Sequence, residues 1–153
     1  MRPHATRVPI IRLWNLLLIP IQGELTDTHA EQLRHDVLDE IHAGGSDGLV
    51  MDVTGLWLMD SHLCAVLTQL AQSAALMGTR TVVCGISADI AMTIQSMGLE
   101  LQGIGTALTL EEALHSFGVR GPPLPDDEHD SPFAAPGNLP PWLGGRDGRN
   151  PGP

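Results

Sequence analysis

The chain has 153 residues, which predicts a single folded domain. Its 18 acidic and 8 basic side chains give a net charge of -10, and it contains neither lysine nor tyrosine. This balance excludes the basic surface that nucleic acids and anionic membranes require, so neither partner is expected. The two cysteines belong to no CxxC or Cys/His cluster, and we predict no metal or other cofactor.

No membrane or export signal is expected in this sequence. The apolar run over residues 16–21 is too short to span a bilayer, and the amino terminus lacks a signal-peptide core followed by a cleavage site. The sequence therefore predicts a cytoplasmic protein with reduced thiols.

The first 117 residues predict alternating strands and helices. Apolar, β-branched segments at 8–14 and 16–21 predict two strands with Asn15 at the turn, and Pro20 restricts its part of the second strand to an edge, an end or a bulge. Apolar residues at helical spacing predict helices from Asp27 to His42 and after Asp60, Ser87 and Thr109. The remaining predicted strands cover 48–53, 79–85 and 104–108.

This ββαβαβαβα order predicts an α/β fold with a mostly parallel mixed sheet and crossover helices. Thr109 and Glu112 match a capping box at the start of the last helix.

Composition changes near Gly118. Between there and Pro153, 16 of 36 residues are Gly or Pro, against 13 of the first 117. Such a segment buries too little apolar surface to offset its chain entropy. We therefore predict a domain over residues 1–117 and a disordered Gly/Pro-rich tail over 118–153. The tail is either a solvated tether or carries a short docking motif around Trp142.

The chemistry-bearing residues follow the strand that ends near Thr54. Asp60 is predicted to be the N-cap of the next helix, which makes Ser61 its first residue, at the positive end of the helix dipole. A phosphate added there would strongly change the charge of the surface. The alternative is that both residues only start the helix.

Two neighbours of Ser61 also have two interpretations. Trp57 either anchors a partner or closes the edge of the sheet. His62 either tunes the affinity for phosphate or is a partly exposed helix residue. Enzymatic use of Ser61 with His62 is not expected, because adjacent helix residues point about 100° apart and no G-x-S-x-G motif is present.

Several segments resemble the STAS domains of anti-sigma-factor antagonists, and more closely the RsbS-type scaffold proteins of stressosomes. The general resemblance lies in residues 23–27, 30–33, 51–54 and 59–61; the RsbS-type resemblance lies in 8–15, 77–86 and 97–108. Together they cover residues 7–117. Direct antagonists often continue Asp-Ser-Ser-Gly, whereas this chain has Asp60, Ser61, His62 and Leu63.

The resemblance implies a non-enzymatic scaffold with Ser61 as its phosphorylated residue. Such a protein would co-assemble with RsbR-like STAS paralogues into a large hetero-oligomer. It would hold an RsbT-like kinase until Ser61 is phosphorylated under stress, and a phosphatase would reset the serine. The implied switch surface comprises Thr54, Trp57, Asp60 and His62 around that serine. Alternatives are a direct antagonist of the RsbV or SpoIIAA type, a STAS partner of a transporter, and, as the least favoured class, an enzyme.

Overall fold

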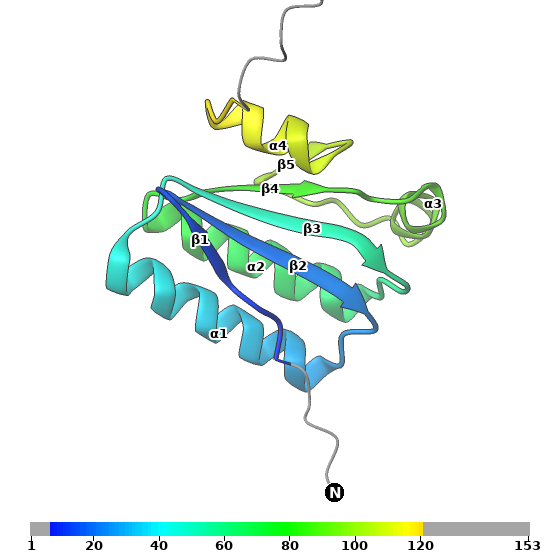
Figure 1. The fold of residues 1–153 in the computed structure, drawn as a ribbon. Coiled ribbons are helices and arrows are strands. Elements are labelled where there is room, and N and C mark those ends of the chain that lie inside the picture. Colours follow the sequence, from blue (N-terminus) through cyan, green and yellow to red (C-terminus); the bar gives the residue numbers. More distant parts are fainter. Residues whose placement is uncertain (1–6, 121–153) are drawn as a thin grey trace, which may run out of the picture. The chain divides into compact units, whose positions relative to one another are not determined.

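The computed structural model describes residues 7–120 (Figure 1). The predicted order of elements is confirmed: β1 (Ile11–Leu13), β2 (Leu16–Gly23), α1 (Asp27–Gly44), β3 (Gly48–Leu56), α2 (Ser61–Leu76), β4 (Arg80–Cys84), α3 (Ala88–Ser96), β5 (Ile104–Ala107) and α4 (Leu110–Ser116). The predicted disordered tail, apart from its first three residues, and Trp142 lie outside the described residues.

The strands form one five-stranded mixed sheet in the order β1-β2-β3-β4-β5. β1 is antiparallel to β2, and every other neighbouring pair is parallel. Helices α1 and α2 cover one face of the sheet and α4 the other, while α3 lies beyond the end of β4 (Figure 1). Strands followed by crossover helices place the carboxyl ends of β2, β3 and β4 at the same edge, which is where α2 begins.

Alternation along the central strands divides the core into two parts. Leu49, Met51 and Val53 of β3 pack with the buried faces of α1, α2 and α3. Val50 points to the opposite face, where it joins a smaller cluster under α4 with Val82 of β4. Both parts are almost entirely aliphatic, as the low aromatic content predicts.

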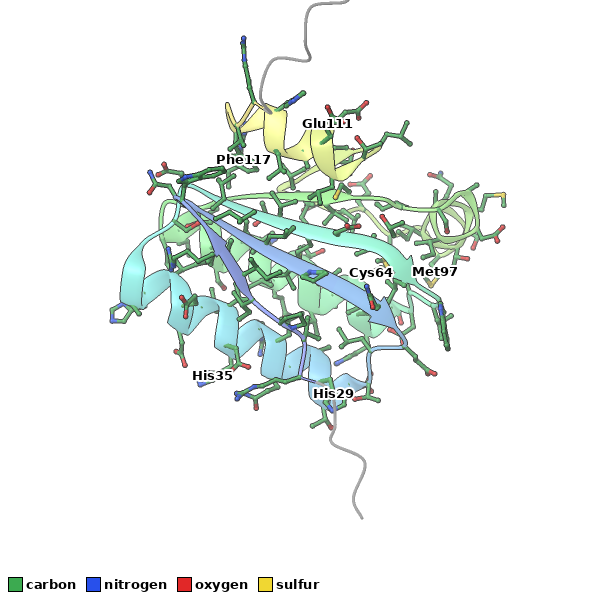
Figure 2. The ribbon with its side chains drawn as sticks, in the orientation of Figure 1. His29, His35, Cys64, Met97, Glu111 and Phe117 are labelled. Carbon is green, nitrogen blue, oxygen red and sulfur yellow. The ribbon has the colours of Figure 1, made fainter. Side chains whose placement is uncertain are left out.

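The smaller cluster holds α4 through Leu110, Ala113 and Leu114 and through the ring of Phe117, which follows the helix. Phe117 lies so close to Gly48 that a Cβ on this glycine would overlap the ring. The Arg80 guanidinium covers the ring at 4.4 Å from its centroid and donates to the Ser116 carbonyl at 2.7 Å. Figure 2 shows Glu111 on α4 and Phe117 directly after it, across the sheet from His29 and His35 of α1.

Several boundaries differ from the predicted ones. The first strand is shorter, because Trp14 adopts φ 51° and belongs to the turn with Asn15. The third strand is longer, because β3 pairs with Gln22 and Gly23 after a register shift that begins at Pro20. This irregularity confirms that Pro20 lies at a bulge.

The helices begin at the expected capping residues. Asp60, Ser87 and Thr109 each accept a backbone N–H of the first turn. The predicted capping box is correct for Thr109, but Glu112 accepts the Leu108 N–H at 3.0 Å, one residue before the cap. Within residues 7–120 the longest and most apolar helices still fall short of what crossing a membrane requires.

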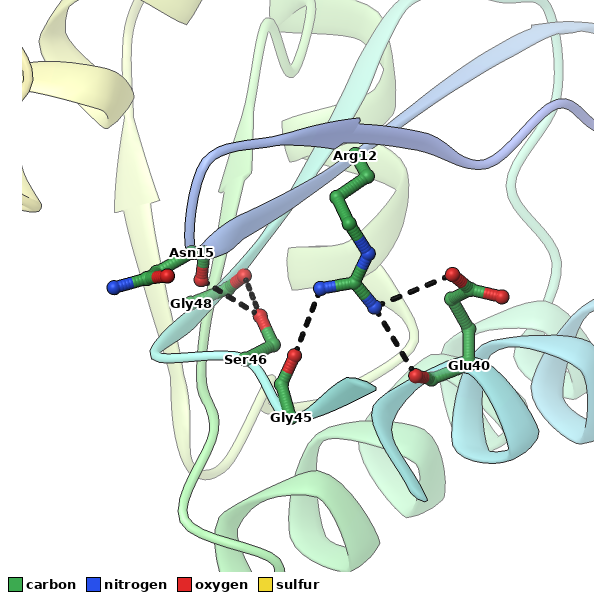
Figure 3. Close-up of polar contacts among 6 residues, drawn as sticks. All are labelled: Arg12, Asn15, Glu40, Gly45, Ser46 and Gly48. Atoms are coloured by element: carbon green, nitrogen blue, oxygen red, sulfur yellow. Dashed lines mark hydrogen bonds and ion pairs between the residues drawn. The ribbon is translucent and has the colours of Figure 1, made fainter. Parts of the chain in front are cut away.

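A polar strap joins β1 to the end of α1 (Figure 3). Arg12 donates to the Gly45 carbonyl at 2.9 Å and to the carboxylate and carbonyl of Glu40, both at 3.2 Å. The Ser46 hydroxyl lies 2.7 Å from the Gly48 carbonyl and 3.1 Å from that of Asn15. These contacts close the amino end of the sheet, opposite the start of α2.

Candidate functional site at the amino end of α2

The end of β3 is shaped by a bulge that Asp52 stabilises. The Asp52 carboxylate accepts the Thr54 N–H at 3.0 Å and the Thr54 hydroxyl at 2.6 Å. The side chain therefore satisfies an N–H at the point where the β2–β3 register shifts. Gly85 lies directly alongside, at φ +78°, where a Cβ would overlap the Thr54 hydroxyl. The Thr54 hydroxyl is thus engaged within the sheet.

The loop between β3 and α2 is anchored to the sheet and the core although two of its side chains are exposed. The Trp57 N–H donates to the Gly23 carbonyl at 2.9 Å, and the Met59 side chain is 1 % exposed in the main core. With both ends held, Trp57 and Leu58 face solvent at 82 % and 52 % exposure. Large apolar side chains this exposed on a fixed backbone are typical of a binding surface.

Asp60 and Ser61 begin α2 as predicted. The Asp60 carboxylate accepts the Leu63 N–H at 2.8 Å, which satisfies one of the free donors of the first turn. Ser61 is the first helical residue and is exposed. A hydroxyl at this position is accessible to a partner while its backbone is held by the cap.

Ser61 lines a shallow groove with residues far away in sequence. Leu99 and Glu100, which follow α3, form the opposite wall. Further lining residues come from α2 itself, among them Cys64, Thr68 and Gln69. Glu100 is exposed, so the groove places a carboxylate near the serine.

His62 points toward a different helix. Its Nε2 lies 3.8 Å from the Asp27 carboxylate and 3.9 Å from that of Glu31, both on α1. The imidazole is 43 % exposed. Ser61 and His62 therefore serve different sides of α2, and their arrangement is not that of a nucleophile with its base.

Not all the predicted switch-surface residues come together. Trp57, Asp60 and Ser61 follow one another along one exposed loop and helix start, whereas Thr54 bonds to Asp52 and His62 faces α1. Sequence reasoning missed three residues of the surface: Leu58, Leu99 and Glu100. Leu58 was detectable as the outward neighbour of a buried Met59; the other two reach Ser61 only through the fold.

The cysteines are core residues and not nucleophiles. Burial, followed by the nearby Asp60 carboxylate, raises the pKa of the Cys64 thiol above its ordinary 9.0. Burial and Asp52 raise the pKa of Cys84 to about 11. Both thiols are therefore neutral near pH 7, and a neutral thiol is a poor nucleophile. Over residues 7–120, His, Cys, Asp and Glu side chains form no group of three that could hold a metal ion.

This geometry agrees with what the chain resembles. The sequence profile of the STAS domain matches residues 7–113. The chain belongs to the STAS domain family. The curated relatives of this STAS protein include the RsbT co-antagonist proteins RsbRD and RsbRA of Bacillus subtilis, which are 26 % and 23 % identical over 103 and 112 residues. These matches cover 67 % and 73 % of the chain but only 37 % and 40 % of the relatives, so the chain spans about two fifths of their length.

Solved structures extend the relationship to scaffold proteins. A serine-to-glutamate form of RsbS from Moorella thermoacetica is 31 % identical, with a TM-score of 0.65 over 74 % of this STAS chain and 96 % of that one. A chain of the stressosome is 30 % identical, with a TM-score of 0.60 over 72 % and 96 %. Unphosphorylated SpoIIAA, at 19 % identity and a TM-score of 0.58 over 74 % and 99 %, shares the fold. This STAS protein is thus related to stressosome components.

Proposed function

We propose that this chain is an RsbS-type scaffold of a stressosome that holds an RsbT-type kinase until Ser61 is phosphorylated. In this role it co-assembles with RsbR-type STAS paralogues in the cytoplasm, and a phosphatase restores the serine. The protein performs no catalysis itself. The relationship to RsbS and to RsbT co-antagonists supports this choice among the functions of STAS domains.

One observation carries the proposal. Ser61 is exposed at the capped amino end of α2, immediately after a loop that holds Trp57 and Leu58 in solvent. A kinase therefore has an accessible hydroxyl and an apolar anchor within four residues. Because Asp60 and Met59 fix the loop, docking orders little additional chain and loses little entropy.

Phosphorylation would act by changing the charge of this surface. A phosphoserine carries about -1.5 to -2 charges at pH 7. At Ser61 it would lie beside the carboxylates of Asp60 and Glu100, so a partner docked over the serine would have to accommodate a concentrated negative charge. One local charge change thereby biases the occupancy of an interface.

The test is to incubate the protein with ATP and the RsbT-type kinase of the same genome, then map phosphate by mass spectrometry. We expect phosphate on Ser61, retention of the kinase by Ser61→Ala, and at least about tenfold weaker binding by Ser61→Asp. Gln72→Glu is the matched control, since it adds one charge to an exposed position on the same helix about 16 Å away. Phosphate on another residue, or equal binding by both Ser61 variants, contradicts the proposal.

Assembly separates this role from that of a direct anti-sigma-factor antagonist. Co-expressed with an RsbR-type protein, a scaffold elutes from a sizing column as a very large particle. A direct antagonist instead forms a small complex with an anti-sigma kinase, and elution at that size would replace the scaffold role with the antagonist one.

A further inference from the structure

Carboxylates surround Ser61 on several sides. Asp60 precedes it, and Glu100 lines the same groove. On the side of His62, the exposed carboxylates of Asp27 and Glu31 border α2 from α1. Asp60 and Glu100 therefore make the surface at Ser61 negative, and Asp27 adds to this acidic rim from the His62 side, where Glu31 is paired with Arg34. Negative surface potential attracts a positively charged partner over a distance of about 10 Å at 0.1 M salt.

Four arginines of the described domain have bonding partners, and one of them, Arg34, pairs with the rim carboxylate Glu31. Arg7 pairs with Asp36, and Arg12 straps β1 to α1. Arg34 holds Glu31 at 2.7 Å and also bonds to Gln69, while Arg80 bonds to the end of α4. The groove walls described above include no basic side chain. None of these four arginines lines the groove at Ser61, although Arg34 bonds to Gln69, which does.

The centre of the same surface is apolar. Trp57 and Leu58 project from a fixed loop, and Leu99 forms one wall of the groove. Protein interfaces commonly combine such an apolar centre, which is dry in the complex, with a charged rim that stays hydrated. The two regions act differently: rim charges govern the rate of encounter, and the dry centre governs the lifetime of the complex.

We propose that the Ser61 surface, formed by Trp57, Leu58, Ser61, Leu99 and Glu100 with its acidic rim, binds a protein partner that presents a basic rim around an apolar pocket for the Trp57 indole. The carboxylates accelerate association with that partner. A phosphate on Ser61 acts in the dry centre, where it is buried without a cation, and so accelerates dissociation. This inference rests on the proposed function, in which the partner is an RsbT-type kinase.

The test is to measure association and dissociation rates of the purified RsbT-type kinase on immobilised protein, from about 50 to about 500 mM NaCl. We expect the association rate to fall at least about tenfold over this range while the dissociation rate changes less than about twofold. Glu100→Gln lowers mainly the association rate, whereas Ser61→Asp and Trp57→Ala raise mainly the dissociation rate, by about tenfold or more.

Two matched variants control the experiment. Trp14→Ala removes an equally exposed tryptophan at the opposite end of the sheet, and Glu111→Gln removes a carboxylate from α4. Both are expected to leave the rates within about twofold of the unmodified protein. Two results would overturn this inference: an association rate that does not depend on salt, or a Trp57→Ala effect no larger than that of Trp14→Ala. If Ser61 is still phosphorylated in that case, the proposed function itself stands. Absence of kinase binding overturns the proposed function as well.

Discussion

Asp60 decides where Ser61 lies. Its carboxylate accepts the Leu63 N–H and thereby ends the loop and begins α2 at one defined residue. Without this acceptor the first turn of α2 exposes an unsatisfied donor, and a frayed first turn no longer holds the Ser61 hydroxyl in one place. The cap is therefore a positioning element for the proposed phosphorylation site.

Replacing this residue separates its hydrogen bond from its charge. Asp60→Ala is expected to lower the free energy of unfolding by about 1 kcal/mol, whereas Asp60→Asn retains most of the stability because an amide oxygen also caps a helix. Urea unfolding followed by tryptophan fluorescence measures both. Equal stability of Asp60→Ala and the unmodified protein would show that the cap contributes nothing.

At the scale of elements, the bulge in β3 sets the direction in which the chain leaves the sheet. Asp52 closes the bulge by accepting both donors of Thr54, and Gly85 at the end of β4 leaves room for the closed loop. The loop with Trp57 starts two residues after β3 resumes pairing at Gly55. Its geometry therefore depends on two neighbouring strands.

Gly85→Ala tests this packing. The new Cβ would overlap the Thr54 hydroxyl, and φ +78° adds backbone strain, so we expect a loss of about 2–3 kcal/mol in the free energy of unfolding. Gly103→Ala is the matched control, because Gly103 has φ +75° and nothing within 4 Å of its Cβ position. Gly103→Ala adds backbone strain without a steric overlap, so we expect it to lower the free energy of unfolding by about 1 kcal/mol. Equal losses in a urea titration would show that the contact with Thr54 is tolerated.

At the scale of the whole molecule, composition makes the alkaline titration unusually simple. The chain has neither lysine nor tyrosine, and arginine stays protonated, so its two cysteines are the side chains that ionise between about pH 8.5 and 11. Cys84 is fully buried in the smaller cluster, and its pKa is raised to about 11. Alkaline stability therefore reports on the burial of these thiols.

The sign of the effect follows from linkage. The folded state keeps the Cys84 proton to a higher pH than the unfolded chain, so its contribution is complete below about pH 9 and is lost as pH rises through about 11. The loss is on the order of 2 kcal/mol. Urea unfolding at pH 8 and pH 10.5 measures this loss of unfolding free energy. We expect a smaller loss in Cys84→Ala, whereas Cys64→Ala should retain the part of the loss that is due to Cys84. An identical decline in Cys84→Ala contradicts the assignment.

Most of the net negative charge of the molecule lies in the predicted domain. Residues 1–117 carry 5 arginines and 13 acids, against 3 arginines and 5 acids in residues 118–153. Arg7, Arg12 and Arg80 are bonded to residues away from Ser61, whereas Arg34 pairs with Glu31. Asp60, Glu100 and Asp27 therefore pair with none of these four arginines. The net charge by itself predicted that nucleic acids are not partners of this protein. The distribution of that charge supports a protein partner with a basic surface.

Local structural features could be predicted from the amino-acid sequence. Helix caps such as Asp60 and Ser87, the glycine stops and the apolar periodicities act within a few residues, so the element order and the α/β class followed without tertiary information. The position of Ser61 at the start of a helix followed in the same way. The true ends of β1 and β3 did not, because they depend on the Trp14 turn and the bulge beside Pro20.

Proximity between distant segments was decided by the tertiary structure alone. Leu99 and Glu100 meet Ser61 because α3 and α2 pack near the same end of the sheet, and His62 turns to α1 because α1 and α2 lie side by side on one face. Contacts between residues this far apart in the sequence depend on strand order and crossover, which no local pattern encodes. The amino acids thus determined which serine begins the helix, whereas the packing of α1, α2 and α3 determined the charges and apolar side chains around it.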